Sequence, residues 1–198
     1  MALEIERKFL LANDDWKREV IKSERLRDGL IARFGEGKVR ARLTESNAWL
    51  TIKGPREGIS RPEREYEIPR ADAEHMLRTL CQGDPVLEKV RHTVPFGGLD
   101  WTIDVYMGPL KGVVLAEIEL EHPNQHLQLP PWVGEEVTND PRYKKGTLAL
   151  RFGHAAPIAL RRAWFEPHHP HRRFRHARCW NTSAIRRPQA QAEQAASA

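Results

Sequence analysis

The sequence is poor in cysteine and has no long apolar run. Its 198 residues contain two cysteines, Cys81 and Cys179, far apart in the chain. Two such thiols do not make the dense disulfide framework of a small secreted domain, so we expect reduced thiols and a cytoplasmic location. No stretch approaches the roughly 18 apolar residues of a membrane span, and charges begin at Glu4, inside the region of a signal peptide. We therefore expect no membrane partner.

Common nucleotide-binding motifs are also missing. Neither a Walker A sequence nor G-x-G-x-x-G occurs, which disfavours the ordinary nucleotide folds. The net charge of +5 does not by itself indicate nucleic acid, because it comes from one end of the chain. Residues from 161 onward hold eight arginines and two acids, whereas the first 160 residues hold 24 basic and 25 acidic side chains. RNA binding through this basic segment is the weakest of our hypotheses.

The length suits one domain with an extension. We predict a folded domain over residues 1–155, where apolar periodicity is regular. Residues 156–198 have little such periodicity and are rich in Arg, His, Ala and Gln. They are predicted to form a basic, disordered tail.

Strand-like stretches dominate the first 121 residues, separated by turn signals such as GEGK and GPREG. Strands are predicted over 2–11, 25–33, 38–45, 48–54, 61–69, 86–95, 99–107 and 113–121. Helical spacing predicts one helix over 70–83. Shorter helical segments are predicted near Asp14, around 132–137 and over 142–152.

Charged and apolar residues alternate along nearly every predicted strand. In the first strand Glu4, Glu6 and Lys8 alternate with apolar Ile5 and Phe9. Period-two alternation gives each strand one apolar and one charged face. In an ordinary barrel the apolar face points inward and the charged face meets water.

Two features favour the reverse arrangement. The charges sort by sign, with Arg40 and Arg42 on one strand and Glu63 and Glu65 on another, although like neighbours repel. The charged faces also carry few of the Ser, Gln and Asn residues usual on solvated strands. The predicted fold class is therefore α+β: a closed eight-stranded antiparallel β-barrel with a charged lumen and helices packed outside.

A charged lumen needs counterions, because buried charges must be paired. Carboxylates bind Mg²⁺ or Mn²⁺, and arginines and lysines bind phosphate. The implied ligand combines a divalent cation with a chain of phosphates. The candidate acids are Glu4, Glu6, Glu63, Glu65, Asp104, Glu117 and Glu119, and the candidate bases are Lys8, Arg40, Arg42, Lys53, Lys89 and Arg91.

These residues lie in motifs that resemble the CYTH superfamily, the triphosphate tunnel metalloenzymes. EIERK matches the family's ExExK signature, and it is followed in order by RAR, TIKG, EREYEI, EKVR, TIDVY and AEIELE. TNDPRYKKGTLA resembles the family's late helical segment. The resemblance covers about residues 1–152 and is closest to bacterial inorganic triphosphatases.

The resemblance implies a tunnel that hydrolyses a phosphoanhydride bond in inorganic triphosphate or a related triphosphate. It implies that Glu4, Glu6 and Glu119 bind one divalent metal, and that Asp104 and Glu117 belong to the same metal-binding face. Glu63 and Glu65 are candidate proton acceptors for an attacking water, and Lys8 is a candidate catalytic residue. The implied phosphate-binding residues are Lys8, Arg40, Arg42, Lys53, Lys89 and Arg91.

One position departs from the family pattern. Many bacterial members carry a tyrosine in the second strand, thought to pair with the signature lysine, but here RDGLIAR places Leu30 there. Without that tyrosine, either Lys8 alone must orient or activate the nucleophile, or a metal-bound water must do so. Lys144 and Lys145 are predicted on a helix near the tunnel mouth, where a solvated helical face is favoured over substrate contact.

Two alternative functions remain open from the sequence. A class IV adenylyl cyclase would use the same tunnel to make cyclic AMP from ATP. A non-catalytic polyphosphate- or nucleotide-binding module would bind without turnover. A homodimer is also compatible with the sequence, which does not settle the oligomeric state.

Overall fold

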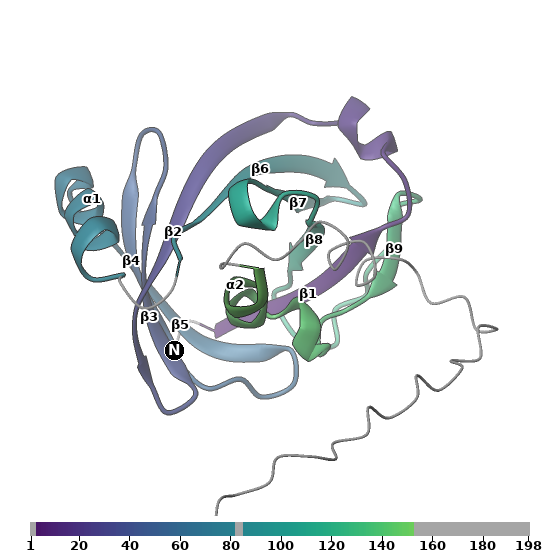
Figure 1. Cartoon of the computed structure of the whole chain (residues 1–198). Helices are drawn as coiled ribbons and strands as arrows, with labels where there is room; N and C mark the ends of the chain where they lie inside the picture. Colours follow the sequence, from purple (N-terminus) through teal and green to yellow (C-terminus); the bar gives the residue numbers. More distant parts are fainter. Residues whose placement is uncertain (1–2, 82–84, 153–198) are drawn as a thin grey trace, which may run out of the picture. The chain divides into compact units, whose positions relative to one another are not determined.

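The computed structural model describes residues 3–81 and 85–152 (Figure 1). The predicted tail over 156–198, and with it the predicted domain boundary, lies outside the described residues. Cys179 lies outside them as well. Among the described residues, none of the helices is both long and apolar enough to cross a membrane.

Eight antiparallel strands close into a barrel, which confirms the predicted fold class. The sheet order is β5-β4-β3-β2-β6-β7-β8-β1, and pairing of β5 with β1 closes the ring. The strands are β1 (Leu3–Leu11), β2 (Lys22–Phe34), β3 (Gly37–Leu43), β4 (Ala48–Lys53), β5 (Ser60–Glu67), β6 (Leu87–Phe96), β7 (Leu99–Tyr106) and β8 (Val114–Glu119). Closure leaves the charged face of each strand turned to a common interior.

A ninth strand, β9 (Val133–Glu136), lies where helical turns were predicted, so the prediction over 132–137 is wrong. One edge of β1 pairs with β5 only over its first residues, Leu3 to Ile5. The rest of that edge pairs with β9, and the Val137 amide donates to the Lys8 carbonyl at 2.8 Å. Unpaired strand edges seek backbone partners. The segment is therefore a strand because it pairs with the free edge of β1, a long-range contact that the local sequence does not reveal.

Within residues 3–81 and 85–152, the longest helix is α1 (Arg70–Thr79), which ends earlier than the predicted 70–83. It packs against β2, β3 and β4, and Figure 1 shows it on the outer side of these strands. Its contact with β2 is very close at Gly29. A Cβ atom there would lie 2.5 Å from both the Leu77 and Cys81 side chains, so glycine permits the approach.

Helices cover only part of the apolar outer face, which corrects the prediction that they wrap it. On β1, β7 and β8 the outward residues include Phe9, Trp101 and Ile118, all buried. Their cover comes from Trp16 of the short 3₁₀ helix η1 (Asp15–Arg18) and from Trp132 in the segment before β9. Large aromatic side chains bury about 150–250 Å² each, so a few of them can cover part of a strand face. The short helix near Asp14 is confirmed.

One end of the barrel is closed by apolar side chains rather than charge. The helix α2 (Lys145–Phe152) lies near this end. It follows the 3₁₀ turn η3 (Pro141–Tyr143) directly, and it contacts both η3 and a second 3₁₀ turn, η2 (Gly108–Leu110), which lies between β7 and β8. Leu148 of α2 is buried in one apolar cluster with Tyr106 and Leu115. Tyr106 lies on the same face of β7 as Asp104, and Leu115 lies on the same face of β8 as Glu117, so both point to the interior. In Figure 1, α2 lies across the barrel in the view down its interior. The predicted helical segment 142–152 is therefore confirmed, and it places Lys145 at the interior.

Candidate active site

The interior contains two cavities of opposite charge. One, of about 300 Å³, is lined by six glutamates together with Arg42, Lys53, Arg91 and Lys145, and we call it the acidic cavity. The other, of about 860 Å³, is lined by nine lysines and arginines and only two acids, Glu6 and Glu36, and we call it the basic cavity. The glutamates of the acidic cavity are Glu4, Glu6, Glu63, Glu65, Glu117 and Glu119. Both cavities are lined by Glu6, Lys53 and Lys145, so they meet at these side chains.

All but two of the side chains predicted for the site line one or both cavities. Lys8 and Arg40 line the basic cavity, and Arg42, Arg91 and the glutamates line the acidic one. Lys89 and Asp104 lie behind the cavity walls and are fully buried. The period-two alternation read from the sequence therefore identified the inward face correctly on β1 and on β3 to β8.

Lys8 lies between two carboxylates. Its Nζ is 3.0 Å from Glu117 Oε1 and 3.6 Å from Glu6 Oε1. Burial opposes the charged form, but Glu117 and Glu6 together raise the pKa of Lys8 above its usual value. Lys8 is therefore an ammonium ion that can bind or orient an anion, and it is not available to remove a proton from water.

Glu4 is held by two cations. Its Oε1 accepts from Lys53 Nζ at 2.7 Å, and its Oε2 accepts from Arg61. Lys53 also donates to Glu63 at 2.8 Å, so one ammonium bridges two carboxylates. Burial disfavours ionisation of Glu4, but Lys53 and Arg61 outweigh it and lower the pKa of this carboxyl.

Asp104 anchors the basic side of the acidic cavity. It accepts two hydrogen bonds from Arg91 at 2.8 Å, a bidentate contact, and a third from Lys89. Arg91 also donates a hydrogen bond to Glu117 at 3.0 Å. Although burial opposes it, Arg91 and Lys89 lower the pKa of Asp104, so the carboxylate stays ionised. The network fixes the Arg91 guanidinium in the cavity wall.

Several interior charges were missed by the sequence reasoning. Asp28 is buried, 3.2 Å from Arg42 and 3.7 Å from Lys89. Lys38 and Arg61 also face the interior, and each lies two residues before a predicted site residue on its strand. Extending the alternation by one step would have found these two. Arg33 and Arg56 line the basic cavity from the ends of strands and turns, where alternation gives no signal.

Lys145 requires a correction. A solvated helical face was favoured for it, but its side chain is only 13% exposed and its Nζ lies 3.3 Å from Glu117. The first turn of α2 enters the barrel end, which turns this lysine inward. Lys144, by contrast, is exposed, although it borders the basic cavity.

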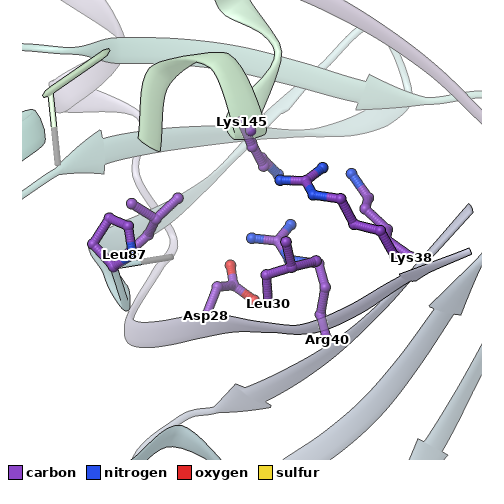
Figure 2. Close-up of a pocket in the computed structure, with 9 residues that line it drawn as sticks. Asp28, Leu30, Lys38, Arg40, Leu87 and Lys145 are labelled. Carbon is purple, nitrogen blue, oxygen red and sulfur yellow. The ribbon is translucent and has the colours of Figure 1, made fainter. Parts of the chain in front are cut away.

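Leu30 faces the site, where the sequence pattern had placed it. It is the Cα partner of Arg40 across β2 and β3 and lines a small pocket with Asp28, Lys38 and Lys145. Figure 2 shows Asp28 and Leu30 rising from one strand while Lys145 enters from the helix above them. A leucine has no proton to exchange. This position therefore adds an apolar wall to a largely cationic pocket.

The acidic cavity fits a hard divalent cation by the chemistry of its donors, which are carboxylate oxygens. Glu6 and Glu119 are directly paired across β1 and β8. Burial, with the nearby Glu4 and Glu6, raises the pKa of Glu119, the signature of crowded carboxylates that a cation would relieve. Within residues 3–81 and 85–152 no three acidic or His/Cys side chains are gathered as a metal cluster. Glu4, Glu6 and Glu117 instead contact lysines and arginines.

Comparison with protein families adds to this geometry. The model of the CYTH domain matches residues 2–152. The chain belongs to the CYTH family. This CYTH chain is 42% identical over 148 residues to an inorganic triphosphatase of Acetivibrio thermocellus, an alignment that covers 75% of the chain and 94% of the relative.

Two further relatives agree. An inorganic triphosphatase of Nitrosomonas europaea is 37% identical over 153 residues, covering 74% of this CYTH chain and 97% of that protein. A crystal structure of an inorganic triphosphatase superposes with a TM-score of 0.54 at 34% identity, covering 74% of this chain and 97% of the other. The resemblance read from the sequence motifs is thereby confirmed.

Proposed function

We propose that this chain is a metal-dependent triphosphatase that hydrolyses a phosphoanhydride bond of inorganic triphosphate. The observation that carries the proposal is the junction of an acidic and a basic cavity inside one barrel. A phosphate chain with a bound divalent cation complements both. The two relatives above 35% identity are named inorganic triphosphatases, which supports the same substrate.

In this proposal the basic residues bind and orient the phosphates. Lys8, Arg40, Arg42, Lys53 and Arg91 line the cavities and can reach them. Lys89 donates to Asp104 and lines neither cavity, which supports a positioning role through Asp104 and Arg91. Such preorganised charge supplies most of the catalysis in phosphoryl transfer.

Glu4, Glu6 and Glu119, with Glu117 beside them, are the residues proposed to hold Mg²⁺ or Mn²⁺. Asp104, which the sequence also predicted as a ligand, lines neither cavity and accepts hydrogen bonds from Arg91 and Lys89, so we assign it the positioning role. When bound, the metal would supply charge neutralisation at the phosphate oxygens and a lowered pKa for water. Lys53 and Arg61, which contact Glu4 in the free protein, are available to contact phosphate when Glu4 is otherwise occupied.

Glu63 is our proposed proton acceptor, with Glu65 as its neighbour on β5. Burial raises the pKa of Glu63, Lys53 opposes this, and Glu4 adds to it. A carboxylate with a raised pKa is a better general base near neutral pH than an ordinary one. Glu65 accepts from Thr51 at 2.8 Å and from Arg42 at 3.3 Å, so it is held toward the same cavity.

A substrate panel tests the proposal. The purified full chain is incubated with inorganic triphosphate, pyrophosphate, ATP and thiamine triphosphate, each with Mg²⁺ or Mn²⁺, and phosphate, pyrophosphate and cyclic AMP are measured. We expect phosphate release from inorganic triphosphate to be fastest, and to stop with EDTA. Cyclic AMP from ATP would instead identify a cyclase, and binding without turnover would identify a non-catalytic module. The same samples, run by light scattering, show whether the chain forms a homodimer, which the sequence left open. The cytoplasmic location stays a prediction.

A further inference from the structure

Two basic side chains of the basic cavity, Lys38 and Arg40, make no ion pair with a carboxylate of the described residues. Most of its lysines and arginines are paired: Lys8 with Glu117, Lys53 with Glu4, Arg56 with Glu6, Arg61 with Glu4 and Lys145 with Glu117. Among the described residues, no carboxylate lies within the 4.0 Å ion-pair distance of Lys38 or Arg40. Arg40 belongs to the phosphate-binding residues already proposed. Lys38 does not, and it is the subject of this inference.

Lys38 sits in a row of like charges across three strands. Its Cα partners are Arg33 on β2 and Lys53 on β4. Like charges directly opposite each other in an antiparallel sheet are destabilising. Four residues along β3, Arg42 has the acid Asp28 as its Cα partner on β2, whereas the Cα partner of Lys38 on β2 is the base Arg33.

Most of the charged side chains around Lys38 are basic. The basic side chains that face this region are Lys8 of β1, Arg33 of β2, Arg40 of β3, Lys53 of β4, Arg61 of β5, Lys145 of α2 and Lys144 of the adjoining turn. The acidic ones are Glu6 of β1, Asp28 of β2 and Glu36 of the turn after β2, and Tyr143 lies beside them. The two acids on β1 and β2, Glu6 and Asp28, are already engaged by other cations. Figure 2 shows Lys38, Arg40 and Lys145 entering the same space from β3 and α2.

These surroundings change the protonation of Lys38. Burial, and then Arg40, Arg61, Lys145 and Lys53, lower the pKa of Lys38 to about 6. In the free protein at neutral pH its amine is therefore mostly uncharged. A neutral amine relieves part of the repulsion within the row, and it can accept a proton as soon as negative charge enters the cavity.

We propose that Lys38 is an additional phosphate-binding residue whose amine takes up one proton from solvent as an oligophosphate anion enters the basic cavity. The identity of the anion rests on the proposed function. The amine accepts the proton on binding, becomes an ammonium that donates to a phosphate oxygen, and returns the proton to solvent when phosphate leaves.

Proton uptake makes binding pH-dependent in a defined direction. Where free Lys38 is neutral and bound Lys38 is charged, each unit of rising pH costs the complex up to about tenfold in affinity. The contribution begins above about pH 6, the free-state pKa of Lys38, and continues until the bound form also loses its proton.

Calorimetry of metal-free binding tests the inference directly. The full chain is titrated with inorganic triphosphate in EDTA at pH 7, in buffers that differ in ionisation enthalpy, and the number of protons taken up is obtained from the slope. Protonation of triphosphate itself is common to all variants. We expect Lys38→Arg, which is always charged, to bind at least as tightly as wild type while taking up nearly one proton fewer.

Two further variants complete the design. Lys38→Met should weaken triphosphate binding about tenfold and should also take up nearly one proton fewer than wild type. It should raise the unfolding temperature of the free protein at pH 7, because folding no longer has to remove the proton that Lys38 carries in the unfolded chain. A merely structural lysine would give the opposite change in stability. Lys111→Met, an exposed lysine in the turn before β8, should match wild type in every measurement.

Equal proton uptake by wild type and Lys38→Arg overturns the inference, whatever the enzyme does with triphosphate. Conversely, a protein that binds triphosphate with the expected proton difference but releases no phosphate with Mg²⁺ or Mn²⁺ contradicts the proposed function alone. A chain that does not bind triphosphate at all contradicts both.

Discussion

At the scale of single residues, Lys8 shows how the interior keeps its charges without collapsing. It contacts Glu6 and Glu117, but neither carboxylate depends on it alone. Glu117 also lies 3.0 Å from Arg91 and 3.3 Å from Lys145, and Glu6 lies 3.4 Å from Arg56. Removing one ammonium therefore leaves no buried carboxylate without a partner, and catalysis can be separated from folding at this position.

We predict that Lys8→Met lowers phosphate release from triphosphate by about 100-fold or more, the scale of losing one preorganised charged donor. Its unfolding temperature should stay within a few degrees of wild type, because the remaining cations hold Glu6 and Glu117. Steady-state kinetics and thermal melts on the same preparation check both. Wild-type turnover by this variant would exclude Lys8 from the active site, and Lys111→Met serves as the control for loss of one lysine.

At the scale of elements, α2 both closes the barrel end and delivers a charge. Leu148 packs in the apolar cluster with Tyr106 and Leu115, and Lys145 lies one turn earlier on the same side of the helix. The apolar contact therefore fixes the position of the cation. The apolar contacts of Leu148 and the ion pair of Lys145 with Glu117 together stabilise the docking of α2, although it places a lysine in the interior.

We predict that Leu148→Ala costs about 2–5 kcal/mol in the free energy of unfolding, as for other large-to-small core changes. Looser seating of α2 should also raise the KM for triphosphate, since Lys145 lines both cavities. Urea denaturation and kinetics measure the two effects. The control is Leu80→Ala, a leucine 51% exposed after α1, where we expect little change in either. An unaltered KM in folded Leu148→Ala would separate α2 docking from the site.

At the scale of the whole molecule, the interior is an ion network whose stability depends on pH. Burial opposes ionisation of Glu4, Asp104 and Glu117, but lysines and arginines lower the pKa of each below its usual value. In the unfolded chain these carboxyls titrate at their ordinary values, near 4. The unfolded state therefore binds more protons below about pH 4, and the stabilisation present above that pH is lost as pH falls toward the native pKa values.

We predict that the unfolding temperature is nearly constant between about pH 5 and 6 and falls steeply below about pH 4. Differential scanning calorimetry across this range measures it. The variant Asp104→Asn should be less stable than wild type at neutral pH, because Arg91 and Lys89 lose their shared partner. It should also lose less stability on acidification. A wild-type melting curve unchanged between pH 5 and 3 would show that the interior carboxylates do not contribute in this way.

The amino-acid sequence by itself determined which face of each strand is charged, and with it the inverted barrel. Period-two alternation is a local property: once a segment is a strand, Glu4, Glu6 and Lys8 must share one side, and Ile5 and Phe9 the other. Leu30 was placed at the site by the family pattern instead, in which a tyrosine occupies its position in the second strand. The choice of the charged face as the inner one needed in addition a comparison of several strands, whose charges sort by sign.

Only the tertiary structure decided which charges meet. β9 became a strand because β1 offered a free edge, Lys145 turned inward because Leu148 docks in the barrel end, and Arg61 reached Glu4 because β5 closes onto β1. Lys38 is distinctive through its partners Arg33 and Lys53, which lie on two other strands. Coulomb interactions act through space and not along the chain, so the pairing of these charges is set by strand register and closure.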